Sequence, residues 1–193
     1  GFRLGVSGGS AIGVMAMPTG HHRVYAKIDG TFTADKMWTA IKAGDSFATT
    51  GPMLSLSADG EEIGATLQLR SSASRLVKVR ARVRSIDLLE SLEIVHNGHI
   101  VASRMVRGEV NESFLDADLE FELIPERSGW VAARTLYRAP DGLLRQAHTS
   151  PIYLSVDDKP GAFADDARYM LKWIDQLAQI AKSSADRFPD NDA

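Results

Sequence analysis

Hydrophobic side chains follow three successive patterns along this chain. Residues 1–50 combine short apolar runs with one helical repeat, residues 51–160 alternate apolar and polar side chains, and residues 161–193 return to a helical period. Alternation is the period of a strand with one buried face, whereas a 3.6-residue period is typical of an amphipathic helix. The pattern therefore predicts a mainly β protein, with an α/β segment at 1–50, a β-sandwich domain at 51–160 and a C-terminal α-helix and tail at 161–193.

The middle segment carries the strongest strand signals. Two turn signals, Asp59-Gly60 and Asn97-Gly98, separate alternating runs, and the second joins the two halves of a hairpin. A series of short strands separated by turns predicts an antiparallel, immunoglobulin-like sandwich of about seven strands. The predicted strands lie in MLSLSAD, ATLQL, RLVKVRARVRS, LESLEIV, HIVASRMV, DADLEFELI, GWVAARTLYR and HTSPIYLSV.

The first segment is predicted to begin with two strands around a loop. Residues 2–10 have the pattern of a short strand that runs into a glycine turn. Residues 11–20 are small and apolar without a clear period, which predicts a buried loop. Residues 21–28 alternate again and predict a second strand.

A helix over residues 34–43 completes the first segment and has recognisable ends. Thr33 suits the N-cap because its hydroxyl can accept a hydrogen bond from an otherwise unpaired amide. Gly44 suits the left-handed position after the last turn. The inner face is predicted to carry Met37, Trp38 and Ile41.

A second helix is predicted after Pro160-Gly161. Asp165 and Asp166 lie in its first turn, where the helix dipole favours negative charge. We expect this helix to pack on the sandwich or on the first segment, and the tail from residue 183 to fray. Its apolar stripe consists of Phe163, Ala167, Met170, Ile174, Leu177 and Ala181.

Composition narrows the possible functions. The 193 residues are 44% hydrophobic and 24% charged, as in a globular protein, and the net charge of −3 gives no general attraction to nucleic acid. No apolar run reaches the ~20 residues that span a bilayer. The chain has no cysteine, which excludes disulfides, thiolate metal sites and thiol catalysis. Localisation stays open, and we favour a periplasmic or secreted protein over a cytoplasmic one.

Five stretches occur in an order that matches one protein family. They are GFRLGVSGGS, GHHRVYAKIDGTFT, WTAIKAGDSFATTGPMLSLSADG, SGWVAARTLYR and AHTSPIYL, and together they span about residues 2–155. The series resembles the C-terminal part of CehA/McbA-type metallohydrolases, which are related to PHP (polymerase and histidinol phosphatase) domains. The first stretch is similar to the last barrel strand of these proteins, and the third to the helix and Gly-Pro turn that follow it.

The resemblance implies a metal-binding barrel, a smaller β-rich domain, and metal-dependent hydrolysis of esters, phosphoesters or carbamates. In the family a Ser-Asp-x-His-type motif supplies late metal ligands. The matching place here reads Ser10-Ala11-Ile12-Gly13, where Ala11 and Ile12 offer no lone pair to an ion. The chain is therefore either the C-terminal piece of a longer protein or a homologue whose site has decayed. A zinc, manganese or iron ion would belong to an upstream barrel domain of the same protein, and this chain is expected to hold no cofactor.

The candidate metal ligands within this chain are His21, His22 and Asp29. Imidazole is the commonest ligand of transition metals in proteins, and Asp29 is a possible partner for it. Neighbouring residues of a strand point to opposite faces, so at most one of the two histidines is predicted to face a given site.

Two other groups of histidines invite a chemical interpretation. His148 and Ser150 share one face of a predicted strand, but no acid that would orient the imidazole is identifiable, and hydroxyls that bond to the backbone are the simpler interpretation. His96 and His99 flank the Asn97-Gly98 turn and would face each other. Two ligands do not make a structural metal site, so a solvated hairpin tip is the simpler interpretation.

Two charged strand faces predict ion pairs rather than a nucleic-acid surface. If the strands are neighbours, opposite charges pair across the sheet. No aromatic side chains stand between the basic ones, as a base-stacking surface would require. The basic face consists of Lys78, Arg80, Arg82 and Arg84, and the acidic face of Asp118, Glu120 and Glu122.

Three functional hypotheses follow. The first is an accessory C-terminal region of a PHP-like metal-dependent hydrolase that is not catalytic on its own. The second is a metal-dependent hydrolase of esters or phosphoesters with a degenerate site near His21 and His22. The third is a carbohydrate- or protein-binding β-sandwich with Trp130, Tyr137 or Tyr153 as contact residues. Enzymatic activity, substrate and oligomeric state stay open.

Overall fold

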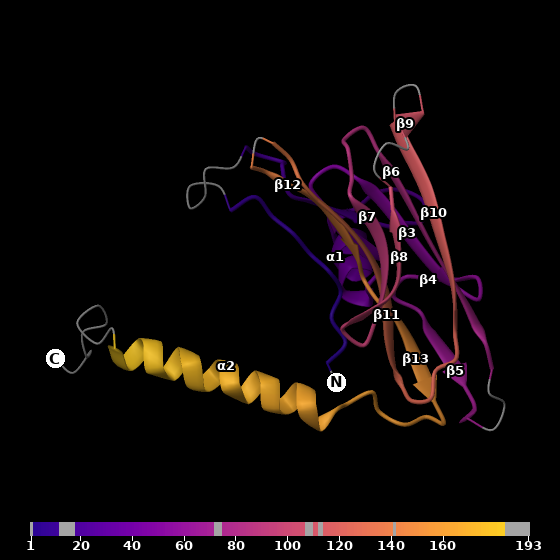
Figure 1. The fold of residues 1–193 in the computed structure, drawn as a ribbon, viewed down its shortest axis with the longest axis vertical. Helices are drawn as coiled ribbons and strands as arrows, with labels where there is room; N and C mark the ends of the chain where they lie inside the picture. The colour runs from indigo at the N-terminus through magenta and orange to yellow at the C-terminus, as the bar shows by residue number, and fades with distance from the viewer. Residues whose placement is uncertain are drawn as a thin grey trace. The chain divides into compact units, whose positions relative to one another are not determined.

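The computed structural model describes residues 2–11, 18–71, 75–106, 110–111, 114–140 and 142–183 (Figure 1). Within these ranges the chain is mainly β, with two antiparallel sheets and two helices, as the sequence predicts. Most of the predicted loop at 11–20 and the predicted frayed tail beyond Ser183 lie outside the described residues.

The larger sheet has eight strands, and all but one of its strand pairs are antiparallel. The exception is the parallel pair formed by the two strands at its far end, β13 and β5. Its path runs through β1 (Arg23–Ala26), β2 (Ser46–Thr49), β12 (Leu144–Thr149), β11 (Gly129–Arg138), β13 (Ile152–Val156) and β5 (Thr66–Leu69). Off this path, β7 (Ser91–His96) pairs with β11, and β8 (His99–Met105) pairs with β7.

The smaller sheet has five strands and packs against the larger one. Its long central pair, β6 and β10, is antiparallel and in register from end to end. In order across the sheet the strands are β4 (Glu61–Glu62), β3 (Met53–Ala58), β6 (Val77–Ser85), β10 (Phe114–Leu123) and β9 (Val110–Asn111).

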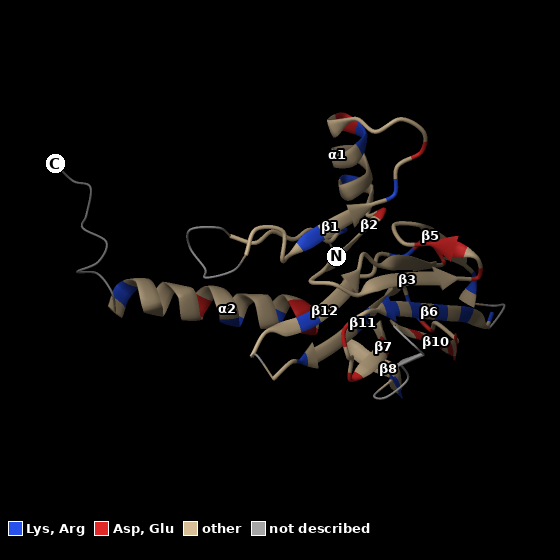
Figure 2. Ribbon diagram, turned by 90° about the horizontal axis from the view of Figure 1, so that it is seen from above, with Lys and Arg blue, Asp and Glu red and all other residues tan. Residues whose placement is uncertain are grey.

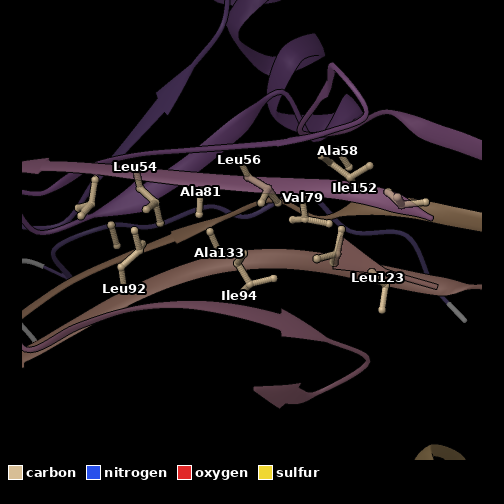
Figure 3. Packing of buried hydrophobic residues seen from close by; sticks show 14 of the residues in the cluster. Leu54, Leu56, Ala58, Val79, Ala81, Leu92, Ile94, Leu123, Ala133 and Ile152 are labelled. Atoms are coloured by element: carbon tan, nitrogen blue, oxygen red, sulfur yellow. The ribbon is translucent and has the colours of Figure 1, made fainter. Parts of the chain in front are cut away.

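The hydrophobic core lies between the two sheets (Figure 3). Along β6 every second side chain is buried, from Val77 to Val83, and the charged side chains between them are exposed, which confirms the predicted alternation. These side chains meet Leu92, Ile94 and Ala133 from the larger sheet. Fully burying one such aliphatic side chain contributes ~1.5–3 kcal/mol to folding, so this interface dominates the stability.

More strands are present than the sequence predicts for residues 51–160. The described residues there form eleven strands rather than about seven. Two of the extra strands, β4 and β9, have only two residues each, too few to show a period. A third arises because the run HTSPIYLSV is interrupted at Pro151, which separates β12 from β13.

The first helix, α1 (Ala34–Ala43), has the predicted ends. The Thr33 hydroxyl accepts a hydrogen bond from the Lys36 amide, and Gly44 has a left-handed φ of 88°. Its inner face differs in one respect, because Ala40 and Ile41 are buried whereas Trp38 is 57% exposed. The prediction that Trp38 points inward is wrong.

Residues 2–10 form an extended strap rather than the predicted strand. The Ser150 hydroxyl accepts a hydrogen bond from the Val6 amide at 2.9 Å, and the Ser46 hydroxyl donates one to the Val6 carbonyl at 2.9 Å. Gly5 passes so close to α1 that a Cβ there would lie 2.0 Å from the Ile41 carbonyl oxygen. The strap is therefore held by hydrogen bonds from side chains, whereas a strand would be held by backbone hydrogen bonds to a neighbouring strand.

The chain divides into two compact units, Phe2–Gly161 and a C-terminal unit from Ala162 onward. The predicted boundary at residue 160 falls at this division. The predicted boundary at residue 50 does not separate two units, because β2 pairs with β12 inside one sheet. The C-terminal unit contains the second helix, α2 (Ala164–Ser183), and none of the residues of this helix is buried. The packing of this helix on the sandwich stays a prediction.

Candidate functional site

His21 and His22 lie side by side just before β1. Their rings meet edge to face with centroids 5.0 Å apart. The prediction that the two side chains diverge is wrong, because the strand begins at Arg23 and the histidines occupy a bend before it. The His22 amide donates a hydrogen bond to the Ser10 hydroxyl at 3.1 Å, which ties this bend to the strap.

The two histidines do not meet Asp29. That residue follows the opposite end of β1 and is exposed, and its carbonyl oxygen accepts a hydrogen bond from the Lys36 ammonium at 3.0 Å. Within the described ranges, no three His, Asp or Glu side chains are grouped so as to hold a metal ion. The structure thus unites two of the three candidate ligands, and metal binding by them stays a prediction. His22 Nδ1 is buried and has no hydrogen-bond partner in the described part of the chain.

The hydroxyls next to His148 serve the backbone, as the simpler interpretation predicts. Thr149 Oγ1 accepts a hydrogen bond from the Ala133 amide at 3.0 Å, and Ser150 is fully buried beneath the strap. His148 is directed elsewhere, with Nδ1 2.7 Å from the Thr149 carbonyl oxygen. Burial, helped by the Arg134 charge, lowers the pKa of His148, so its imidazole stays neutral near pH 7.

The hairpin tip beside His96 is docked on β11 through His96 and Asn97, whereas Gly98 and His99 are exposed. Asn97 and Gly98 have φ angles of 48° and 84°, as a type I′ turn requires. The Asn97 amide donates to the Trp130 carbonyl at 3.1 Å, and Asn97 Oδ1 accepts from the Trp130 amide at 3.0 Å. His96 Nδ1 lies 3.0 Å from the same carbonyl oxygen, and burial lowers the His96 pKa. The predicted solvated tip thus holds for Gly98 and His99 but not for His96 and Asn97.

The charged faces of β6 and β10 pair as predicted, and Figure 2 shows the Lys and Arg residues along β6. Arg82 makes two hydrogen bonds to Asp116, at 2.7 and 2.8 Å, and Arg80 bonds Asp118 at 3.1 Å. These hydrogen bonds run diagonally, since Arg82 stands opposite Asp118 in the register, whereas Arg84 contacts Asp116 directly opposite at 3.3 Å. The hydrogen bonds from Arg82 hold the pKa of Asp116 below its usual range.

Two of the three candidate contact aromatics line a small hollow. Trp130 and Tyr153 are cross-strand partners, and both are only partly buried. Together with His148 they line a cavity of about 200 Å³ that Phe2 and Leu4 of the strap border. Tyr137 instead packs on the hydrophobic core. The sequence could not indicate that the strap lies beside these aromatic residues.

A larger groove escaped the sequence prediction. It has a volume of about 540 Å³, and its aromatic wall consists of Tyr25 and Phe47, whose rings stack at 5.2 Å. The two residues are 22 positions apart and meet because β1 and β2 pair in antiparallel register. The alternation within β1 places Tyr25 on one face of the strand, but it does not show that Phe47 is the residue beside it.

Comparisons with known proteins give no match that would test the family resemblance described above. No protein-family model matches the chain, and no curated protein matches it. Among the described residues there is also no helix with the length and apolar character needed to cross a bilayer.

Proposed function

We propose that this chain is the accessory C-terminal region of a PHP-like metal-dependent hydrolase, and that catalysis requires a barrel domain that it contacts. The support is the ordered series of family-like stretches, together with one structural observation. Large apolar side chains in residues 2–43 are exposed to solvent. They are Phe2, Leu4, Phe32 and Trp38, with exposed fractions of 96, 72, 66 and 57%.

Exposed apolar side chains of this size favour a contact surface. Isolated exposed hydrophobic residues are common, but several large ones in one segment are typical of a surface that another body covers. The segment concerned is also the part that resembles the end of the barrel. The sandwich would brace the barrel, and the strap and α1 would contact it.

The proposal is tested by an activity assay on the purified chain. The substrates are aryl esters and aryl phosphoesters, each with Mn²⁺, Zn²⁺ or Fe²⁺. We expect no turnover above the rate of the metal ion alone. Robust turnover by the chain would overturn the claim that it is not catalytic.

The contact surface needs a separate test. Trp38→Ser and Phe32→Ser should reduce the binding of a hydrophobic dye without lowering the melting temperature, because neither side chain is buried. Leu88→Ser is the matched control, since Leu88 is similarly exposed but lies outside this segment. The complete reading frame of the gene gives the decisive result, because a barrel with an upstream His-x-His motif is expected there.

A second candidate function rests on the histidine pair. The buried Nδ1 of His22, unpaired within the described residues, and the adjacent His21 ring would suit a degenerate metal site. Metal analysis of the native protein distinguishes this function from the first. One ion per chain that is lost in His22→Gln would favour the enzyme, and absence of bound metal would favour the accessory region.

A further inference from the structure

The groove beside Tyr25 is formed partly by the edge of a strand. The lining includes all of residues 53–57, five consecutive positions of β3. Side chains of a strand alternate between its faces, so consecutive residues can line one groove only if the edge of the strand borders it. The backbone of β3 is therefore accessible from the groove.

Along most of one edge of β3, backbone amide and carbonyl groups have no partner strand among the described residues. On one side β3 pairs with β6 over its whole length. On the other side β4 pairs only with Ser57 and Ala58, so residues 53–56 have no ladder partner there among the described strands. The chain leaves this edge because Gly64, with φ of 85°, turns it toward β5 in the other sheet.

This edge also lacks the usual protection against pairing. Natural edge strands carry lysine, proline or inward charges that prevent unwanted strand addition. Residues 53–56 read Met-Leu-Ser-Leu, with no charge and no proline. The neighbouring edge strand β1, by contrast, contains Arg23 and ends next to Lys27.

The two sides of the groove differ in chemistry. On one side the stacked Tyr25 and Phe47 rings give an apolar wall. On the other side Met53, Ser55 and Ser57 share one face of β3. Arg82 and Arg80 of β6 stand beside the two serines, with their guanidinium groups bonded to Asp116 and Asp118. A strand in the groove would alternate between an apolar contact and a polar one.

The size of the groove fits one strand. The four unpaired residues extend over ~14 Å at ~3.4 Å per residue, and the groove beside them has a volume of about 540 Å³. An added strand would lie ~4.8 Å from β3, between it and the stacked rings. The β1–β2 wall leaves no space for a whole sheet, which disfavours a second copy of this chain.

We propose that the β3 edge binds an extended peptide segment of a protein partner by strand addition. The peptide carries apolar side chains at alternate positions, against Tyr25 and Phe47, and hydroxyl or acidic side chains between them, near Ser55 and Ser57. Main-chain hydrogen bonds to residues 53–56 supply affinity, and the two walls supply specificity. None of the four exposed residues on which the proposed function rests lines this groove, although Tyr25, Ala26 and Lys27 belong to the same segment.

The test uses the full chain and fluorescent eight-residue peptides that alternate valine or leucine with glutamate or threonine. We expect saturable binding for part of this set, with alternate amides of residues 53–56 protected from hydrogen exchange. The same peptides N-methylated at alternate residues keep their side chains but lose the donors. Their affinity should fall at least tenfold.

Variants of residues that line the groove test whether the peptide binds there. Tyr25→Ser and Met53→Glu change side chains that are partly exposed, so the fold is retained, and each should weaken peptide binding at least fivefold. Tyr169→Ser in α2, an exposed tyrosine that is not among the residues lining the groove, should not change it. No saturable binding across the set, equal affinity of the methylated peptides, or a dimer in sedimentation that Met53→Glu dissociates would overturn the proposal.

Discussion

At the residue scale, the contact between Asn97 and Gly129 fixes the position of the β7–β8 hairpin. A Cβ on Gly129 would lie 2.1 Å from Asn97 Oδ1, the oxygen that accepts the Trp130 amide. Only glycine leaves room for this side chain. The turn residue thus has a tertiary role beyond its φ angle.

Gly129→Ala should therefore destabilise the protein, by roughly 1–3 kcal/mol if it behaves like an overpacked core position. The midpoint and slope of urea unfolding measure the change. Gly9→Ala is the control, because a Cβ there meets nothing within 4 Å, and its stability should match that of the parent. Equal stability of the two variants would contradict the assigned contact.

His96 makes the same contact sensitive to pH. The Trp130 carbonyl can only accept, so the proton must be on Nδ1, and Nε2 then accepts from the side-chain Nδ2 of Asn97 at 3.3 Å. Protonation of His96 would place an N–H on Nε2, which would then face the N–H of Asn97 Nδ2, so two donors would meet without an acceptor. Burial also disfavours the charged ring and lowers the His96 pKa.

Stability should consequently fall as the pH drops from 7.5 toward 5.5. An unfolded histidine titrates near ~6.5, and the folded pKa is lower, so below pH ~6.5 the unfolded chain binds more protons. The loss continues until the pH passes the folded pKa. His148, whose pKa burial also lowers, adds to the slope with the same sign.

Urea unfolding at several pH values tests this, with His96→Gln expected to give a shallower decline. His99→Gln, at the exposed cross-strand position, should keep the parental slope. An unchanged slope in His96→Gln would show that the decline comes from other groups.

At the element scale, the ladder between β6 and β10 depends on a carboxylate that serves two arginines. Asp116 contacts Arg82 at 2.7 Å and Arg84 at 3.3 Å. We expect Asp116→Asn to lower stability and to reduce its dependence on salt, since exposed ion pairs are screened by ions. Urea midpoints at low and high NaCl measure both effects.

Glu122→Gln is the matched control on the same strand, because Glu122 forms no ion pair with another described residue. Its salt dependence should equal that of the parent. The pH dependence that Asp116 contributes has the same sign as that of His96, because stability falls as the pH drops in both cases, but it lies at lower pH. The Asp116 pKa is lowered, so its stabilising contribution is present above an unfolded pKa of ~3.8 and is lost as the pH falls through the folded value.

Elements with a local signal were predictable from the sequence, and tertiary partners were not. The Thr33 cap, the Gly44 end, the Asn97-Gly98 turn and the β6 alternation all depend on neighbours in the sequence. The strap was predicted as a strand because nothing local reveals that Ser46 and Ser150 would bind Val6. The groove was missed for the same reason.

At the scale of the whole molecule, the two compact units differ in what holds them together. Every residue of the buried core cluster lies between Leu54 and Val156, within the first unit. The helix α2 contributes no buried residue. The first unit thus contains a complete core.

Truncation after Gly161 should leave the sandwich folded. We expect the shortened chain to keep the strand signal in circular dichroism and a melting temperature close to that of the parent. Truncation after Asp158, which removes Gly161 from its position against Gly129, should lower the melting temperature. A sandwich that unfolds without α2 would contradict the division into two units.

The pairing of β2 with β12 bears on synthesis in the cell. Thr49 pairs with Ala147, which is synthesised about a hundred residues later, so β2 cannot take its place in the larger sheet until then. At ribosomal speeds of ~5–20 residues per second, that delay is roughly 5–20 s. During this interval Phe47 lacks its partner Thr149 on β12, so chaperone capture should peak before residue 149 leaves the exit tunnel.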